Sequence, residues 1–271
     1  MSISFDRVSN IYDATRGFPP GVSEQIADYI LDLVSATPDT QFFEAGIGTG
    51  RIALPILQRG YAYTGVDVSE KMMTELRRKL QGADHRLKLL QADVTSLPFV
   101  DDSFDVALAV HVLHLIPNWQ QALAEIRRVL KPSGVFLYTD GRNRSLDIED
   151  AQNNHGRSEF DQQWRSLLVH YGFQHSDYGA TRAEVLDSLR KQGATVETVT
   201  AAQWDTEWTV GELLNRYQGR MYSSCWQIPE DVFSQAIADL TDWCLQHYGS
   251  LEAEVSHKTH FTLTVVRNWA C

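Results

Sequence analysis

The feature that most constrains the fold is an alternation of short apolar runs with helical patterns between residues 40 and 139. Apolar runs occupy 40–45, 61–66, 87–92, 104–110 and 134–139, and helical patterns lie between most of them, at 50–59, 69–81 and 118–131. Strands that alternate with helices of this length predict βαβ units, which form a parallel sheet with right-handed crossovers. The runs are apolar on both sides, as expected of a sheet with helices on both faces.

Two of these helices have recognisable ends. Ser69 is a suitable N-cap for the helix 69–81, and Gly82 follows close to its end. The sequence LKPSG is expected to stop the helix 118–131, because Pro132 and Gly134 both disfavour its continuation.

The alternation becomes irregular after Thr139. A polar loop is expected first, and then helices around 157–171 and 180–192, a strand at 195–210, helices at about 209–220 and 229–248, and a final strand within 257–269. The second half is rich in aromatic residues, which are expected to be mainly core, although some should line a pocket: Phe160, Trp164, Tyr171, Phe173, Tyr222 and Trp226. The regular half thus predicts a scaffold, and the irregular half is expected to shape a pocket on it.

Composition narrows the class of protein. The 271 residues carry a formal net charge of −11 with no basic stripe, which argues against nucleic acid as a partner. The N-terminus lacks the apolar stretch of a signal peptide, and the longest apolar run, VALAVHVLHLI, is too short to span a membrane. Three cysteines in the last fifth of the chain, without metal-like pairing, favour a reducing compartment. A cytoplasmic protein is therefore expected.

A glycine-rich turn follows the first apolar run of the alternation. In FFEAGIGTGR, the residues Gly46, Gly48 and Gly50 allow the chain to reverse tightly and to bring its backbone against a ligand. Asp67 closes the next apolar run, about twenty positions after Gly46, as in nucleotide-type cofactor sites. A carboxylate there can accept two hydrogen bonds from a ribose diol and disfavours a 2′-phosphate, so NADP is not expected.

The spacing of the glycines argues against NAD as well. The dinucleotide fingerprint G-x-G-x-x-G/A would place its third small residue at position 51, which is Arg51, whereas the third glycine is Gly50. The pattern G-x-G-x-G, preceded by Glu44, is suited to a cofactor without a pyrophosphate. An NAD-dependent oxidoreductase therefore remains the less favoured alternative.

With these motifs the chain resembles the class I S-adenosylmethionine-dependent methyltransferases. Their first motif, (D/E)-x-G-x-G-x-G, is matched by Glu44, Gly46, Gly48 and Gly50. Their acidic residue after the second strand is matched by Asp67, and the Asp that contacts the adenine amino group by Asp93 in QADVTSLPF. The match covers about residues 5–140. It implies a Rossmann-like α/β fold with a seven-stranded, mostly parallel sheet, whose last strand is antiparallel and pairs with the sixth.

The resemblance also implies the remaining contacts to the cofactor. The N-terminal FDRVSNIYDATRG is similar to that of the small-molecule branch related to ubiquinone and menaquinone methyltransferases, in which Tyr12 and Arg16 would close over the cofactor. Val68 and Val94 follow the two acidic residues and are expected beside it. The implied cofactor is S-adenosyl-L-methionine, with S-adenosyl-L-homocysteine as product.

The implied organisation is a single methyltransferase domain over 1–271. Within it we expect an N-terminal cap at 1–36, a cofactor-binding core at 37–140, and helical insertions at 141–178 and 209–250 that shape the acceptor pocket.

The implied reaction is an in-line transfer of methyl to a small-molecule O, N, C or S nucleophile. Because such a transfer depends mainly on placing two reactants, little acid–base chemistry is required. If a base is used, His111 and His114 are the candidates by position; His111 is expected to contact the cofactor or substrate, or only to pack. The two histidines lack a third ligand at metal-site spacing, so no metal is expected. A non-catalytic cofactor-binding protein is a further alternative, and neither the acceptor nor the oligomeric state follows from the sequence.

Overall fold

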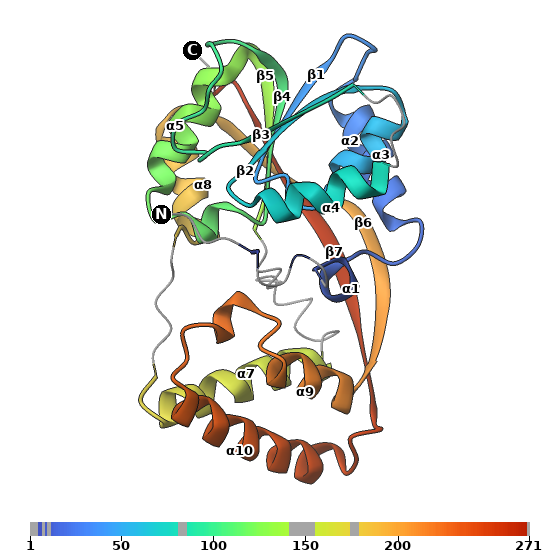
Figure 1. The fold of residues 1–271 in the computed structure, drawn as a ribbon, viewed down its shortest axis with the longest axis vertical. Helices are drawn as coiled ribbons and strands as arrows, with labels where there is room; N and C mark the ends of the chain where they lie inside the picture. The colour runs from blue at the N-terminus through green and yellow to red at the C-terminus, as the bar shows by residue number, and fades with distance from the viewer. Residues whose placement is uncertain are drawn as a thin grey trace. The chain divides into compact units, whose positions relative to one another are not determined.

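The computed structural model describes residues 5–6, 9, 12–80, 86–140, 155–173 and 179–269. Within them lies a seven-stranded sheet of order β3-β2-β1-β4-β5-β7-β6 (Figure 1). The strands are β1 Gln41–Ala45, β2 Ala62–Asp67, β3 Leu87–Gln91, β4 Phe104–Val110, β5 Leu130–Thr139, β6 Thr195–Thr209 and β7 Glu254–Arg267. The helices are α1 Tyr12–Arg16, α2 Val22–Leu33, α3 Ala53–Gln58, α4 Glu70–Leu80, α5 Trp119–Val129, α7 His155–His170, α8 Arg182–Lys191, α9 Val210–Gln218 and α10 Glu230–Tyr248, with single 3₁₀ turns η1 Leu113–Leu115 and η2 Ser223–Cys225.

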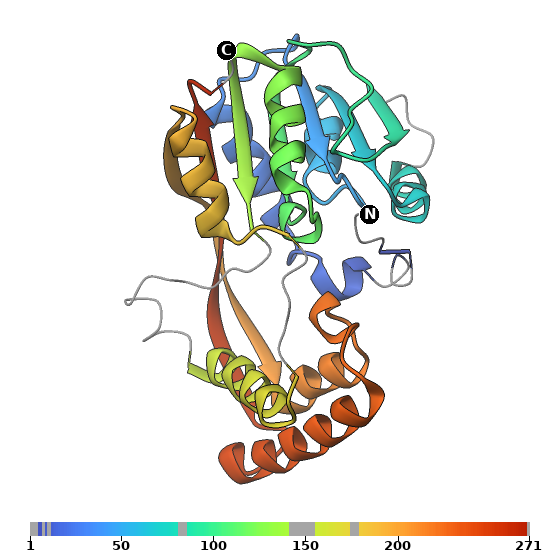
Figure 2. The same cartoon turned by 90° about the vertical axis from the view of Figure 1, so that its left-hand side faces the viewer.

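The first five strands form the predicted parallel sheet. β1 pairs with β2 on one side and β4 on the other, and β2–β3 and β4–β5 pairs are parallel as well. β7 is antiparallel to β5 and lies between β5 and β6. Helices α5 and α8 lie on one face and α2 and α3 on the other (Figures 1 and 2). The predicted Rossmann-like fold, including the antiparallel last strand, is confirmed.

The boundary between α5 and β5 differs from the prediction. The helix ends at Val129, and the strand begins at Leu130, four residues before its predicted start. The LKPSG segment thus belongs to the strand, where the pairing of β4 with β5 shifts register between Phe104 and Val106. Pro132 explains this, because a proline disfavours helical backbone in the residue before it and donates no hydrogen bond to a ladder.

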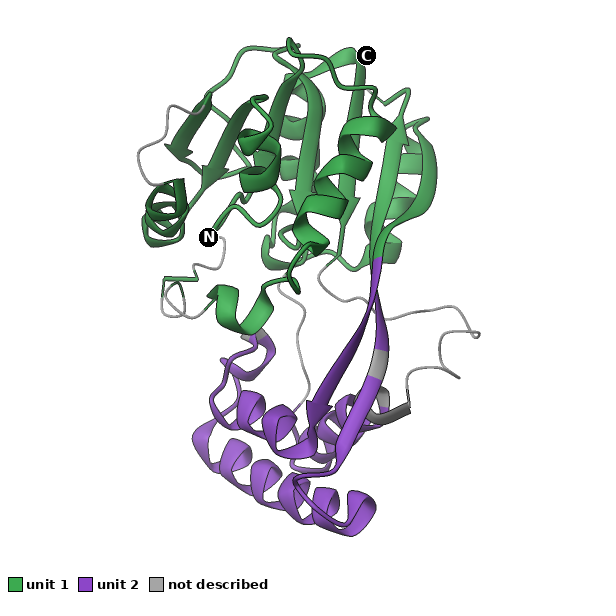
Figure 3. Cartoon of the chain, turned by 90° about the vertical axis from the view of Figure 1, so that its right-hand side faces the viewer, with its two compact units in different colours: residues 1–143, 177–202, 260–271 green, residues 144–176, 203–259 purple. Residues whose placement is uncertain are grey.

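The chain divides into two compact units (Figure 3). Unit 1 comprises 1–143, 177–202 and 260–271, and unit 2 comprises 144–176 and 203–259, so the long strands β6 and β7 contribute to both. Helices α7, α9 and α10 of unit 2 surround a buried cluster that includes Phe160 and Trp164. The single domain over 1–271 stays a prediction. Most of the expected polar loop, at 141–154, and the end of the expected insertion, at 174–178, lie outside the described residues.

Candidate functional site

A pocket of about 610 Å³, including its open mouth, lies in unit 1 at the carboxyl ends of the parallel strands. Its walls come from the turns after β1, β3 and β4, from the end of β2 and from α4, and also from the N-terminal segment. The lining residues are Phe5, Tyr12, Gly46, Gly48, Asp67, Val68, Met72, Val94, Val110, His111, Val112, Leu115 and Ile116. The strand order reverses at β1 and β4, and this switch point is where open α/β sheets bind ligands.

The glycine-rich turn reaches the pocket through two of its three glycines. Gly46, Gly48 and Gly50 all have positive φ, at 75°, 55° and 76°, a region that favours glycine. A Cβ on Gly46 would lie 2.6 Å from Cγ2 of Val112, so only glycine fits beside the turn after β4. Gly50 lies away from the pocket, where a Cβ would collide with Leu76 of α4. The missing side chain at Gly50 therefore leaves the space that Leu76 occupies.

Asp67 joins this turn to the end of β2. Its Oδ2 accepts a hydrogen bond from the backbone N–H of Gly48 (2.8 Å), and its Oδ1 accepts one from the N–H of Ser69 (2.8 Å). Burial raises the pKa of Asp67, while these N–H groups oppose the shift. The carboxylate lines the pocket beside Val68. It is therefore held in place by backbone groups and presents an acceptor to a ligand.

Glu44 lies beneath the turn rather than in the pocket wall. Only 3% of its surface is exposed, and Oε2 accepts a hydrogen bond of 2.8 Å from the hydroxyl of Tyr63. Burial raises the pKa of Glu44 to about 8, with Tyr63 and Arg51 opposing the shift. The buried carboxyl of Glu44 thus favours its protonated form, and it joins β1 to β2 through Tyr63.

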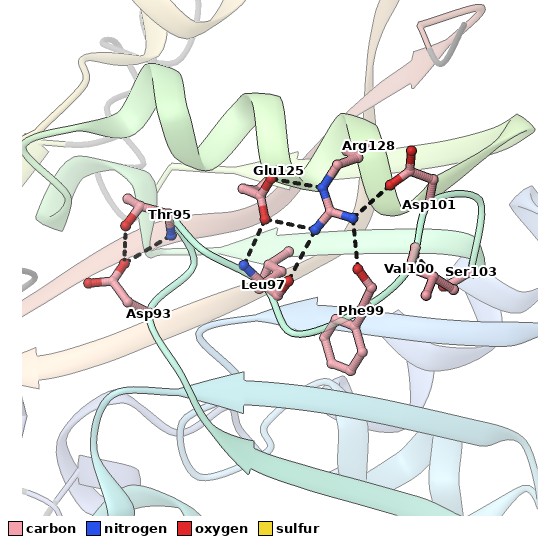
Figure 4. A network of polar contacts seen from close by, with 9 residues as sticks. All are labelled: Asp93, Thr95, Leu97, Phe99, Val100, Asp101, Ser103, Glu125 and Arg128. Atoms are coloured by element: carbon pink, nitrogen blue, oxygen red, sulfur yellow. Dashed lines mark hydrogen bonds and ion pairs between the residues drawn. The ribbon is translucent and has the colours of Figure 1, made fainter.

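Asp93 shapes the turn after β3. Its Oδ1 accepts hydrogen bonds from the N–H and the hydroxyl of Thr95, at 2.9 and 2.8 Å (Figure 4). Asp93 is not among the lining residues, whereas its neighbour Val94 is. Of the predicted cofactor contacts Asp93 and Val94, Val94 is therefore the one that lines the pocket.

The segment after this turn is fastened to α5 by hydrogen bonds to an ion pair within that helix, Arg128–Glu125 (Figure 4). Arg128 donates to Glu125 and to the carbonyls of Leu97 and Phe99, and Glu125 accepts from the N–H of Leu97. The hydrogen bonds of Arg128 keep the pKa of Glu125 below its ordinary value. This clamp fixes the wall that carries Val94.

The N-terminal segment is fastened to the motif turns. Tyr12 lines the pocket and packs edge-to-face with Phe5, with ring centroids 5.8 Å apart. Asp13 accepts a hydrogen bond from the hydroxyl of Thr49 (2.6 Å) and pairs with Lys79 of α4 at 2.5 Å. A hydrogen bond from Ser69 to Asp6 adds a second attachment. The N-terminal segment is thus held beside the pocket by contacts with the glycine-rich turn and with α4 and the residue before it.

Arg16 lies behind Tyr12 rather than in the pocket wall. Its guanidinium is 5.2 Å from the centroid of the Tyr12 ring, and its carbonyl accepts a hydrogen bond of 2.6 Å from Arg51. Arg51 also lies over Tyr12 and Phe18, at 5.6 and 5.1 Å. Arg51 therefore links α1 to the glycine-rich turn, a role that its sequence position did not reveal.

His111 follows β4 and lines the pocket in a left-handed conformation, with φ 56°. Nη2 of Arg51 lies 3.2 Å from its Nδ1. A guanidinium can only donate, so Nδ1 accepts and the ring proton of the neutral imidazole is on Nε2. Burial, and then the charges of Arg51, His114 and Arg16, hold the pKa of His111 well below its usual range. His111 is therefore neutral at pH 7, with its ring proton on Nε2.

His114 is positioned differently. It belongs to η1, does not line the pocket, and its Nδ1 lies 3.6 Å from Oδ1 of Asp140. Among the described residues, no group of three or more His, Cys, Asp or Glu could hold a metal ion. No helix in the described part of the chain is long and apolar enough to cross a bilayer.

The pocket thus brings together most of the sequence-predicted site residues, with four exceptions. The predicted residues in its wall are Tyr12, Gly46, Gly48, Asp67, Val68, Val94 and His111, and those outside it are Arg16, Glu44, Gly50 and Asp93. Sequence reasoning missed the apolar lining residues Phe5, Met72, Val110, Val112, Leu115 and Ile116. Their signal is the same as that of any core residue, so only the fold could identify them.

Comparison with known proteins finds similarity to methyltransferases. A methyltransferase domain model matches residues 43–138. The chain is 30% identical over 195 residues to a fatty-acid O-methyltransferase of Mycolicibacterium smegmatis, and this alignment covers 69% of the chain and 65% of that protein. It is 33% identical over 135 residues to a demethylmenaquinone methyltransferase of Clavibacter sepedonicus, where the alignment covers 49% of the chain and 55% of that protein. The chain thus spans less than two thirds of the length of these two relatives.

A solved structure shares the fold. Phosphoethanolamine N-methyltransferase 2 of Haemonchus contortus, in complex with phosphomonomethylethanolamine and S-adenosylhomocysteine, superposes with a TM-score of 0.55 at 15% identity, covering 97% of this chain and 58% of that one. At this identity the similarity extends to the fold alone.

Proposed function

We propose that this chain, whose residues 43–138 match a methyltransferase domain model, transfers a methyl group from S-adenosylmethionine to a small-molecule acceptor. The observation that carries the proposal is the geometry of Asp67. Its carboxylate ends β2, lines the pocket, and is oriented by the N–H groups of Gly48 and Ser69. A fixed carboxylate at this place is suited to accept the two hydroxyls of a ribose.

Other residues of the pocket fit the rest of the cofactor. The absence of side chains at Gly46 and Gly48 lets a ligand approach the backbone closely. Val94 and Met72 offer apolar walls for an adenine ring, and we propose Asp93 as the partner of its amino group. Tyr12 would cover the site from α1. The solved structure that shares this fold and holds S-adenosylhomocysteine supports the choice of cofactor.

When bound, S-adenosylmethionine supplies a methyl group on a sulfonium sulfur. The protein's contribution is to hold the acceptor in line with that methyl group and to exclude water. Such placement can lower the barrier by roughly 7–11 kcal/mol. The neutral His111, with its proton on Nε2, is suited to orient an acceptor by donating a hydrogen bond rather than to remove a proton from it.

Calorimetry with S-adenosylmethionine, S-adenosylhomocysteine and NAD tests the cofactor. We expect the first two to bind to the wild-type chain and NAD not to bind. NAD binding without S-adenosylmethionine binding would instead support an oxidoreductase. A transfer assay with methyl-labelled cofactor then separates an enzyme from a non-catalytic binding protein.

A further inference from the structure

We propose that the methyl acceptor is a carboxylate, and that Nε2–H of His111 binds it. This inference rests on the proposed function and names the chemical class of its substrate.

The first observation is the shortage of a proton acceptor in the pocket. Among the described lining residues, Tyr12, Asp67 and His111 are the titratable ones. Asp67 is at the proposed ribose position, and phenols are poor bases at neutral pH. Nδ1 of His111 already accepts from Arg51, so Nε2 carries the ring proton. An acceptor that must lose a proton therefore finds no base among these described lining residues.

The second observation is the sign of the charge around His111. Arg51 contacts the ring from the glycine-rich turn, and Arg16 of α1 acts on it as well. His114 of η1 is the third titratable neighbour, and it is paired with Asp140 at 3.6 Å. The groups that act on His111 are therefore cationic or neutral, and they favour an anionic ligand.

The third observation is the apolar wall next to His111. Val110, Val112, Leu115 and Ile116 line the pocket on this side. An apolar wall with one N–H donor and positive charge behind it complements an organic acid, with a hydrocarbon body and one carboxylate.

A carboxylate also balances the reaction without a base. It is already ionised at neutral pH, since its ordinary pKa is about 4. A lone pair of one carboxylate oxygen forms the new O–C bond, the C–S bond breaks, and its electron pair stays on sulfur. The anion and the sulfonium become a neutral ester and a neutral thioether, with no proton transferred. Nε2–H of His111 would hold the other oxygen, and Arg51 is a positioning residue that fixes the tautomer of His111.

The decisive experiment reads the bond that is formed. The full chain is incubated with methyl-labelled S-adenosylmethionine and a small-molecule extract of the cells that encode it, and the labelled products are treated with mild alkali. Methyl esters release labelled methanol, whereas ethers and N-, S- and C-methyl products do not. We expect most of the transferred label to be released.

Label that resists alkali would overturn the carboxylate assignment and leave the proposed function intact. Absence of transfer despite binding of S-adenosylhomocysteine would overturn both, and would indicate a binding protein. Failure to bind the cofactor at all would refute the proposed function first.

Two matched pairs of variants test the residues, using an acid identified in that assay. His111→Phe removes the donor and is expected to raise KM for the acid roughly tenfold or more, whereas His111→Gln keeps an N–H and should lose less. Because His111 lines the cofactor pocket, S-adenosylhomocysteine affinity is measured alongside, and it should change by less than KM for the acid in both variants. An equal loss with Phe and Gln would mean that His111 only packs.

Arg51→Met tests the positioning role through pH. Without the guanidinium, Nδ1 can take a proton and the pKa of His111 should rise, although burial still holds it down, so the change of KM for the acid with pH should move to higher pH than in the wild type and in Arg51→Lys. A pH profile of KM in Arg51→Met that is identical to that of the wild type would refute the role. Affinities for S-adenosylhomocysteine and 5′-methylthioadenosine, which lacks the amino-acid end, provide the control: a loss in Arg51→Met for the first ligand only would show that Arg51 binds the cofactor's own carboxylate.

Discussion

The two compact units bury different kinds of side chain. The buried polar side chains of the described residues all belong to unit 1, namely Glu44, Thr49, Ser69, Thr139 and Thr264. The cluster of unit 2 is built from apolar and aromatic residues such as Phe160, Trp164 and Phe233. A unit that must orient a ligand keeps polar groups in fixed places inside it, whereas a unit held by ring packing needs only shape and volume.

The largest effect on stability is expected in unit 2, whose buried cluster is held by packing. Trp164 is 3% exposed, lies edge-to-face with Phe233, and packs against Tyr217 with ring centroids 5.2 Å apart. Trp164→Ala should lower the free energy of unfolding of unit 2 by about 3–5 kcal/mol. Hydrogen exchange of the α10 amides measures this loss.

Two variants of α7 serve as controls for that change. Nε1 of Trp164 is buried and makes no hydrogen bond within the described residues, so Trp164→Phe should lose much less. Val169 is 60% exposed, and Val169→Ala should change stability by less than about 0.5 kcal/mol. Loss of S-adenosylhomocysteine affinity in Trp164→Ala, beyond about threefold, would contradict the assignment of the cofactor to unit 1.

The second effect tests the buried carboxyl of unit 1. The pKa of Glu44 is raised from 4.5 to about 8, so the stability that it contributes is complete below about pH 4.5 and is lost as pH rises through 8. Glu44→Gln should remove this pH dependence, which is worth up to a few kcal/mol. Urea unfolding of both proteins at several pH values measures it, and identical slopes against pH would contradict the raised pKa.

The third effect is on the ligand rather than on the fold. Asp67→Ala removes the carboxylate at the end of β2 and should weaken binding of S-adenosylhomocysteine at least tenfold, about 1.4 kcal/mol. Asp67→Asn, which keeps one acceptor oxygen, should lose less. Calorimetry measures both, and an unchanged affinity in Asp67→Ala would mean that the ribose contact is wrongly assigned.

The smallest effect is expected on the surface of unit 1. The pair Lys191–Asp187 on α8, at 2.6 Å, has both side chains more than half exposed, at 74% and 62%. Lys191→Ala should change the free energy of unfolding by less than about 0.5 kcal/mol. Thermal unfolding of the variant at low salt measures it. A loss of stability as large as that in Trp164→Ala would contradict the expectation that an exposed ion pair contributes much less than a buried aromatic side chain.

The sequence predicted most of the scaffold because its periodicity is a local property. The short strands at 41–45 and 104–110 and the helix 230–248 lie within a residue or two of the predicted ranges. The start of β5 was missed because the local signal of Pro132 and Gly134 indicates a turn, and only pairing with β4 extends the strand to Leu130.

The site, too, has residues that the sequence predicts and contacts that it does not. Gly46, Gly48 and Asp67 were predictable, since a tight turn and a fixed acceptor require those residue types. The link from Arg51 to His111 joins residues 60 positions apart through side chains, and no periodicity reveals such a contact. Gly65 was missed for a related reason: it leaves room for Ile47, and a strand glycine has no distinctive signal for such a neighbour.

Hydrogen exchange of the whole chain, with and without S-adenosylhomocysteine, tests whether this pocket binds the cofactor. We predict slower exchange on addition of the ligand at 46–50, 67–69 and 93–95, and at 110–112 after β4. We predict no such change on addition of NAD. Unchanged exchange at these four segments with S-adenosylhomocysteine, or protection by NAD instead, would mean that the cofactor site is wrongly assigned.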